Sequence, residues 1–258
     1  MFRVFLYGLV ALIAIWLIAP LFVVVVTSFN ADASYNFPPT ELSLRWYANF
    51  FGDAGWRRSF WDSVTVAFAS ALLATVVGAM AAITLHRSTF FGRQAISGLF
   101  IGPAMVPGIL LAIGLYALFT RLGLLGTLQG FIFAHAVVAL PLVVINVGAA
   151  LQTLDPKLEV AAASLGAGKI NVVRQITLPL ILPGIIAGSV FAFVHSFDEI
   201  IISLFIQSPY LQTLPVKMYQ SVTHDSDPTV AAVAVLMMLI SIGLAACTML
   251  FQPRRTRK

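Results

Sequence analysis

The sequence has little charge and almost no cysteine. Of its 258 residues 10% are charged, whereas 60% are hydrophobic. Soluble domains carry about a quarter charged residues. A water-soluble fold of this size could not hide so much apolar side chain, so the surplus must face lipid. The single cysteine, Cys247, excludes an internal disulfide and a cysteine metal site. It is expected to be a small buried or lipid-facing residue.

Motifs for nucleotide binding and hydrolysis are also missing. A P-loop requires Gly-x-x-x-x-Gly-Lys-Ser/Thr, but Gly168-Lys169 is followed by Ile170, and Ala163 occupies the first glycine position. The chain contains no His-Glu-x-x-His and no Gly-x-Ser-x-Gly, which argues against an intramembrane hydrolase. We therefore expect no enzyme activity, metal or cofactor in this chain. The net charge of +5 favours the anionic inner leaflet over nucleic acid.

Six apolar stretches are long enough to cross a bilayer, which takes about 20 helical residues. The third is the least regular because Pro103 and Pro107 interrupt it. The first is too long for a secretory signal and has no cleavage site, so we interpret it as an uncleaved span. The sequence predicts an all-α membrane protein with a single transmembrane domain over residues 1–258. The stretches cover about residues 5–27, 64–85, 95–119, 131–151, 182–206 and 230–251.

The distribution of basic residues predicts that both termini are cytoplasmic. With the N-terminus placed there, ten of the 15 basic residues fall on the cytoplasmic side: Arg3, Arg87, Arg93, Lys157, Lys169, Arg174, Arg254, Arg255, Arg257 and Lys258. The other five fall outside: Arg45, Arg57, Arg58, Arg121 and Lys217. The outer loop, about residues 28–63, carries Trp46, Tyr47, Trp56 and Trp61. We expect these aromatic residues to anchor the loop at the membrane interface, with contact to an external partner as the alternative.

The loop between the fourth and fifth spans, about residues 152–181, has the pattern of an ordered segment. Asp155 is a good N-cap and Pro156 suits the first helical position. Gly166 and Gly168 supply a helix stop. A second short helix is expected over about 170–176, with Pro179 and Pro183 marking the start of the fifth span. Helical spacing is carried by Leu158, Ala161, Ala162 and Leu165.

This segment resembles the conserved cytoplasmic loop of ABC importer permeases. The family pattern is Glu-Ala-Ala, three residues, Gly, nine residues, Ile-x-Leu-Pro, and here the matching residues are Ala161, Ala162, Gly166, Ile176, Leu178 and Pro179. The position of the family's glutamate is Val160, and Glu159 lies one residue earlier, about 100° around a helix. The resemblance implies a type I permease fold with a coupling helix that fits a groove on a separate cytoplasmic ATPase. The implied coupling residues are Glu159, Ala161, Ala162, Gly166, Ala167, Ile176, Leu178 and Pro179.

Other segments resemble the spermidine/putrescine branch of these permeases. They are Ser28-Phe29-Asn30, Leu44-x-Trp46-Tyr47, Ser196-Phe197-Asp198-Glu199 and Leu214-Pro215-x-Lys217-x-Tyr219. The resemblance implies a bacterial inner-membrane permease that works by alternating access. Its implied partners are an ABC ATPase dimer that binds ATP and Mg, a second permease subunit, favoured to be a paralogue, and a periplasmic solute-binding protein. It suggests a polyamine as solute, with other small amines, opines or phosphonates as alternatives.

Charged residues within the fifth span are the candidate substrate residues. A carboxylate at membrane depth costs several kcal/mol unless it is hydrated or paired. Asp198 and Glu199 could share a helical face with His195, which lies three and four residues earlier. We hypothesise that they line a path for a cationic solute, and a structural pair bonded to neighbouring helices is the alternative. His135 and Asn146 add polar groups to the fourth span.

Two further features concern packing and the choice of function. Gly98-x-x-x-Gly102 and Gly184-x-x-x-Gly188 are typical of closely packed membrane helices and are expected to pack inside the chain or at a subunit interface. The competing functions are an ion-coupled secondary transporter that acts without an ATPase, and a structural or assembly subunit. Copurification of an ATPase and a second permease would distinguish the ABC permease from a carrier that acts alone.

Overall fold

The computed structural model describes residues 2–33, 37–225 and 227–250. Within these ranges the regular elements are helices, accompanied by isolated bridges between Asn30 and Leu42 and between Ser208 and Leu211. Helices are the expected solution because the backbone in a bilayer core has no water with which to bond. Some predicted residues lie outside the described ranges. Phe251, the last residue of the sixth predicted stretch, is one of them. The others belong to the predicted cytoplasmic set: Arg254, Arg255, Arg257 and Lys258.

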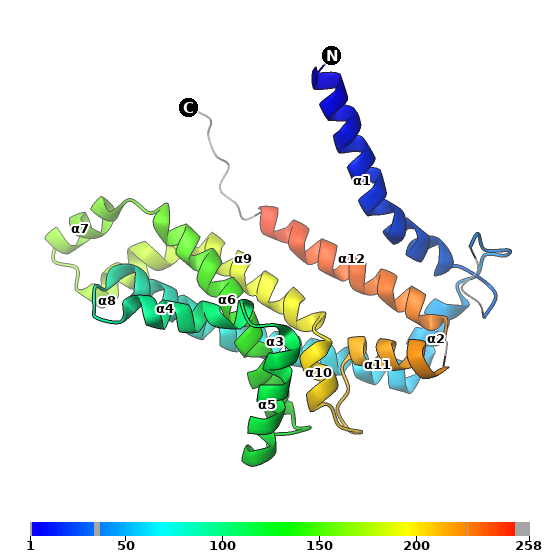
Figure 1. Cartoon of the computed structure of the whole chain (residues 1–258). Coiled ribbons are helices and arrows are strands. Elements are labelled where there is room, and N and C mark those ends of the chain that lie inside the picture. The colour runs from blue at the N-terminus through cyan, green and yellow to red at the C-terminus, as the bar shows by residue number, and fades with distance from the viewer. Residues whose placement is uncertain (1, 34–36, 226, 251–258) are drawn as a thin grey trace. The chain divides into compact units, whose positions relative to one another are not determined.

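Among the described residues, six candidate membrane-spanning elements correspond in order to the six predicted stretches (Figure 1). Five spans are formed by α1 (Phe2–Thr27), α3 (Ala54–Arg87), α6 (Leu128–Gln152), the segment Lys169–Phe197, and α12 (Thr229–Leu250). The sixth is a bent pair. The shorter elements are α2 (Arg45–Gly52), α7 (Pro156–Ser164), α8 (Lys169–Val172), η2 (Val173–Thr177), α9 (Leu178–Phe197), α10 (Ile201–Ile206), α11 (Leu214–Gln220) and η3 (Ser221–Asp225).

The bent pair is the third predicted span, and its prolines lie at the bend as expected. It consists of α4 (Arg93–Ile101), the short η1 (Gly102–Ala104) and α5 (Gly108–Leu122), with 102° between the two parts. Pro107 takes an extended conformation directly before α5. Proline has no amide hydrogen to continue the α4 hydrogen-bond ladder, so the helix ends and a new one begins in another direction.

The fifth predicted span differs from the expectation of one continuous helix over 182–206. It begins earlier, because Pro179 lies in the first turn of α9, where its missing amide hydrogen costs nothing. It also stops at Phe197, and α10 starts at Ile201 after a three-residue break. Hydropathy could not locate this break, because apolar residues continue on both sides of it.

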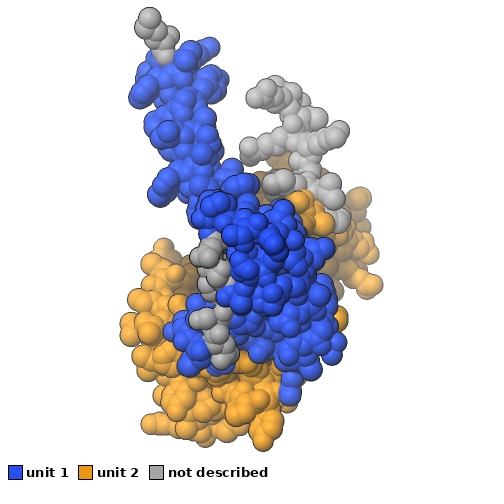
Figure 2. All heavy atoms as spheres, turned by 90° about the vertical axis from the view of Figure 1, so that its right-hand side faces the viewer, with its two compact units in different colours: residues 1–60, 217–242 blue, residues 61–216, 243–258 orange. Residues whose placement is uncertain are grey.

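Two compact units divide the chain: residues 1–60 with 217–242, and residues 61–216 with 243–258 (Figure 2). In the first unit the outer loop is held by its aromatic side chains. Trp46 Nε1 donates to the carbonyl oxygen of Asn30 at 2.8 Å, and the Ser28 and Tyr47 hydroxyls bond to each other at 2.8 Å. Lys217 Nζ lies 5.0 Å from the centre of the Trp56 ring.

The expectation that the loop's tryptophans anchor at the membrane interface is wrong for two of them. Trp46 and Trp56 are 7% and 2% exposed, so they pack within the protein. Their indole groups are buried because each also finds a hydrogen-bond acceptor inside the unit. Trp61, at 64% exposure, keeps the surface position that either interface anchoring or partner contact requires.

In the second unit the core is built on α6 and α9, which lie side by side (Figure 1). The pair approaches closely at Gly184 and Gly188, as the sequence predicted. A Cβ atom at Gly184 would lie 2.5 Å from the Cβ of Ala150, and one at Gly188 would lie 3.1 Å from the Cα of Val143. Gly98 and Gly102 differ, because a Cβ built there meets no other described heavy atom within 4 Å beyond its chain neighbours and its own helix backbone.

The Gly184 contact yields a stability prediction. Gly184→Ala should lower the melting temperature of the purified chain in detergent, because overpacking a tight helix contact costs about 1–3 kcal/mol. Gly98→Ala is the matched control, since its added methyl group meets open space and alanine favours the helix. Equal melting temperatures for the two variants would contradict the close α6–α9 contact.

Candidate functional site

The loop between α6 and α9 forms the predicted short helix. Asp155 Oδ1 accepts a hydrogen bond from the amide of Lys157 at 2.9 Å, and Pro156 occupies the first turn of α7. The helix stops at Gly166, whose φ of 89° lies in the left-handed region that glycine adopts without strain. The amide of Ala167 then closes onto the carbonyl oxygen of Ala162 at 3.1 Å. The cap, the helix and the stop are therefore confirmed.

The second short helix is present as α8 and η2, and it runs without a gap into α9. Ile176 is half-buried in η2, while Leu178 and Pro179 begin α9 and are exposed. Because α8, η2 and α9 are continuous, no intervening loop separates the second short helix from the membrane helix.

The two faces of α7 have different chemistry. Glu159 and Ala162, three residues apart, are half-buried, whereas Ala161 is exposed. Val160, at the position of the family's glutamate, is 64% exposed, and Leu165 and Ile170 reach 89% and 81%. Glu159 therefore points inward, and the outward surface consists of small and apolar side chains. Exposed apolar side chains of this kind indicate a surface that another protein covers.

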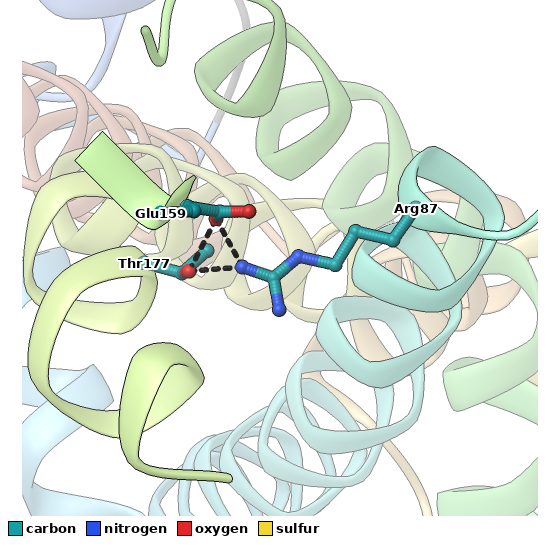
Figure 3. Close-up of polar contacts among 3 residues, drawn as sticks. All are labelled: Arg87, Glu159 and Thr177. Carbon is teal, nitrogen blue, oxygen red and sulfur yellow. Dashed lines mark hydrogen bonds and ion pairs between the residues drawn. The ribbon is translucent and has the colours of Figure 1, made fainter. Parts of the chain in front are cut away.

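The inward carboxylate belongs to a three-residue cluster, which we call the Arg87 clasp: Arg87, Glu159 and Thr177 (Figure 3). Arg87 Nη2 donates to Glu159 Oε1, with which it forms an ion pair, and also to Thr177 Oγ1. Thr177 Oγ1 in turn donates to Glu159 Oε1 at 2.6 Å. Sequence reasoning missed Arg87 and Thr177, because nothing in a sequence indicates which distant side chain will meet an out-of-register glutamate.

At the other end of α9, a buried histidine of α6 contacts both sides of the break in the fifth span, and we call this arrangement the histidine brace. His135 of α6 is fully buried; its Nδ1 lies 3.1 Å from the carbonyl oxygen of Ser196, and its Nε2 lies 2.9 Å from Ser203 Oγ. A carbonyl oxygen can only accept, so the ring hydrogen lies on Nδ1 and Nε2 accepts from Ser203. One imidazole therefore joins the last turn of α9 to the first turn of α10.

A serine of α3 completes this network. Ser70 Oγ lies 2.8 Å from Ser196 Oγ, which also lies 2.8 Å from His135 Nδ1. Such contacts give the Ser196 carbonyl oxygen and hydroxyl additional partners beside the helix break, in an apolar surrounding. The sequence marked His135 as a polar group in a span, but Ser70 and Ser203 carried no signal, because small hydroxyl residues are common in membrane helices. Asn146, the other polar residue of the fourth span, donates to the Leu142 carbonyl within α6.

The break places the two candidate carboxylates differently. Glu199 is half-buried, and its Oε1 accepts from the amide of Ile202 at 3.0 Å, which caps α10. Asp198 and His195 are exposed. Asp198, directly after α9, keeps a helical backbone with its amide bonded to the Val194 carbonyl oxygen at 3.1 Å, so it follows His195 by about one turn, whereas Glu199 lies beyond the end of the helix. Among the described residues no ion pair joins His195 to either carboxylate.

An exposed carboxylate at the end of a membrane helix is restricted in what it can face. Facing hydrocarbon would cost several kcal/mol, so such a group faces water, a solute or another chain. The brace on the buried side and the free carboxylate on the exposed side therefore make this break a candidate contact for a cation that passes through the membrane.

Sequence comparisons place the chain among transport proteins. The model of the family "Binding-protein-dependent transport system inner membrane component" matches residues 74–257. The spermidine/putrescine permease PotC of Haemophilus influenzae is 33% identical over 235 residues, which cover 91% of each chain. The PotC protein of Escherichia coli K12 is 30% identical, covering 97% of this chain and 94% of its own length. The putrescine permease PotI of the same organism is 30% identical, covering 86% and 82%.

Solved structures show the same fold at lower identity. A chain of a bacterial ABC transporter involved in the import of alginate superposes with a TM-score of 0.75 at 14% identity, covering 98% of this chain and 96% of that one. A chain of the MetNI methionine ABC transporter, in an inward-facing conformation, superposes with a TM-score of 0.62 at 20% identity, covering 76% and 96%. These matches confirm the predicted type I importer fold.

The histidine brace yields a prediction about the break. His135→Phe should lower the melting temperature of the purified chain by an amount equivalent to about 1–3 kcal/mol, because the Ser203 hydroxyl and the Ser196 carbonyl oxygen lose a buried partner. Ser189→Ala is the control, since that hydroxyl donates to the Ile186 carbonyl of its own helix. If both variants melted like the unsubstituted chain, His135 would not be bracing the break.

Proposed function

The chain belongs to the family of binding-protein-dependent transport system inner membrane components, and on this premise we propose that it carries a polyamine or a related small amine. It is a permease subunit of an ABC importer and not a catalytic subunit. Family membership removes the alternative of a carrier that acts without an ATPase. The observation that carries the choice of solute is Asp198, an exposed carboxylate at the break between α9 and α10.

A carboxylate at this position suits a cationic solute. Its cost in the membrane falls when a cation or water is beside it, so the site favours an amine over an anion or an apolar solute. Glu199 is engaged by the amide of Ile202, so it adds negative charge while its position is fixed. His195 lies one turn earlier and is exposed as well. We assign Asp198 the direct contact, with Glu199 and His195 shaping the potential around it.

The relatives support the same class of solute. PotC of H. influenzae and of E. coli is named for spermidine and putrescine, and PotI for putrescine. The shared length, at or above four fifths of each chain, extends across the spans that would line a pathway. Opines, phosphonates and other small amines remain the alternative solutes.

The proposed assembly follows from the exposed apolar face of α7. That face docks an ABC ATPase dimer, which binds ATP and Mg, while a second permease subunit, a paralogue of this chain, completes the pathway. A periplasmic binding protein delivers the solute. Binding of ATP switches the pathway from inward-facing to outward-facing, and hydrolysis resets it. This arrangement requires both termini and α7 to be cytoplasmic in the bacterial inner membrane.

Uptake measurements test the role of Asp198. In cells or proteoliposomes that contain the whole importer, Asp198→Asn should reduce spermidine uptake about tenfold, because the neutral amide loses roughly one charge-assisted contact. Glu41→Gln, which neutralises an exposed carboxylate of the outer loop, is the matched control. Unchanged uptake by Asp198→Asn in a normally assembled importer would exclude the direct contact.

Cysteine labelling tests the orientation. In a Cys247→Ala background, Ser164→Cys at the exposed end of α7 should react with a membrane-impermeant maleimide in inside-out vesicles and not in intact spheroplasts. Asp32→Cys in the outer loop should show the opposite pattern. Labelling of residue 164 from outside would reverse the proposed topology and remove the ATPase from α7.

A further inference from the structure

We infer that Arg87 and Thr177 are positioning residues for energy coupling: the Arg87 clasp ties α7 to the end of α3 and to the start of α9. The inference rests on the proposed docking of an ATPase on α7. In this arrangement Glu159 is not a contact to the ATPase. It is the internal attachment through which movement of α7 reaches two membrane helices.

The clasp joins three separate elements at single residues. Arg87 is the last residue of α3, Glu159 lies in the first turn of α7, and Thr177 is the last residue of η2, directly before α9. Arg87 and Glu159 are 72 residues apart in the sequence. Without the clasp, α7 would contact mainly its chain neighbours α8 and η2.

The chemistry of the clasp favours a fixed geometry. Thr177 is fully buried, and its hydroxyl both accepts from Arg87 and donates to Glu159, so the three groups form a closed set of hydrogen bonds. The side chains of Arg87 and Glu159 are 25% and 23% exposed, which shields their ion pair from much of the solvent. The guanidinium group is planar and always charged, so its donors hold their directions. Its charge also suits the C-terminal end of α3, where the helix dipole is negative.

The position of the clasp connects the docking face to the candidate pathway. The outward face of α7 bears Val160, while Glu159, one residue away, points inward into the clasp. Thr177 continues into α9, a helix of about 30 Å whose far end carries the break at Asp198. A displacement of α7 therefore acts on the start of the helix that ends at the candidate solute contact, and Arg87 draws the end of α3 with it.

Coupling efficiency measures this role. In proteoliposomes with the complete importer and its binding protein, Glu159→Gln and Arg87→Gln should raise the ATP hydrolysed per spermidine imported by about fivefold or more, the usual scale of one coupling contact. The ATPase should still copurify in normal amount, since the outward face of α7 is unchanged. The double variant should be no worse than either single variant, because both remove the same interaction.

Three further variants separate positioning from folding. The charge swap Arg87→Glu with Glu159→Arg should recover part of the coupling ratio. Thr177→Ser, which keeps the hydroxyl, should resemble the unsubstituted protein, whereas Thr177→Val, which keeps the shape, should be uncoupled. Arg93→Gln is the matched control, because this exposed cytoplasmic arginine lies outside the clasp.

Two results would overturn the inference. One is a coupling ratio unchanged in all clasp variants of a working importer. The other is loss of ATPase copurification with Glu159→Gln, which would make Glu159 a docking residue. The proposed function fails in a different way, namely when the unsubstituted chain neither binds an ATPase nor supports ATP-dependent uptake.

Discussion

A bilayer core offers the backbone no hydrogen-bond partner, and the arrangement of this chain follows from that constraint. It explains why the apolar stretches become helices and why the backbone groups at every departure from a helix need hydrogen-bond partners nearby. At the break in the fifth span such a partner is His135, which hydrogen-bonds to the Ser196 carbonyl oxygen on one side and to the Ser203 hydroxyl on the other. The break can then hold a charged residue on its exposed side without leaving the opposite side unpaired.

The two ends of α9 differ in their contacts. At its start, Thr177 joins the Arg87 clasp, where the groups are partly shielded and a complete ion pair is stable. At its end, Asp198 is exposed and Glu199 caps α10. Between these ends α9 packs on α6 through Gly184 and Gly188, which bring the two backbones close together. Such close packing holds α9 firmly against α6 between these two ends.

Neighbouring residues of α7 face different surroundings because the ends of the helix are fixed. The cap at Asp155 and the glycine stop at Gly166 fix where α7 begins and ends, so a shift of one residue rotates a side chain without moving the helix. Val160 then presents an apolar group outward, and Glu159 turns toward Arg87. The proposed docking surface is accordingly apolar at Val160, and the carboxylate of Glu159 is bonded inside the subunit.

The sequence alone determined the span count, the irregular third span, the cap and stop of α7, and the family. These depend on hydropathy, proline chemistry and residues near one another in the chain, where local rules hold. The tertiary structure decided the break after Phe197, the partners of Glu159, the brace around His135 and the burial of Trp46 and Trp56. Each of these depends on side chains that are brought together by helix packing from distant positions, and no local pattern states which of several polar groups will meet.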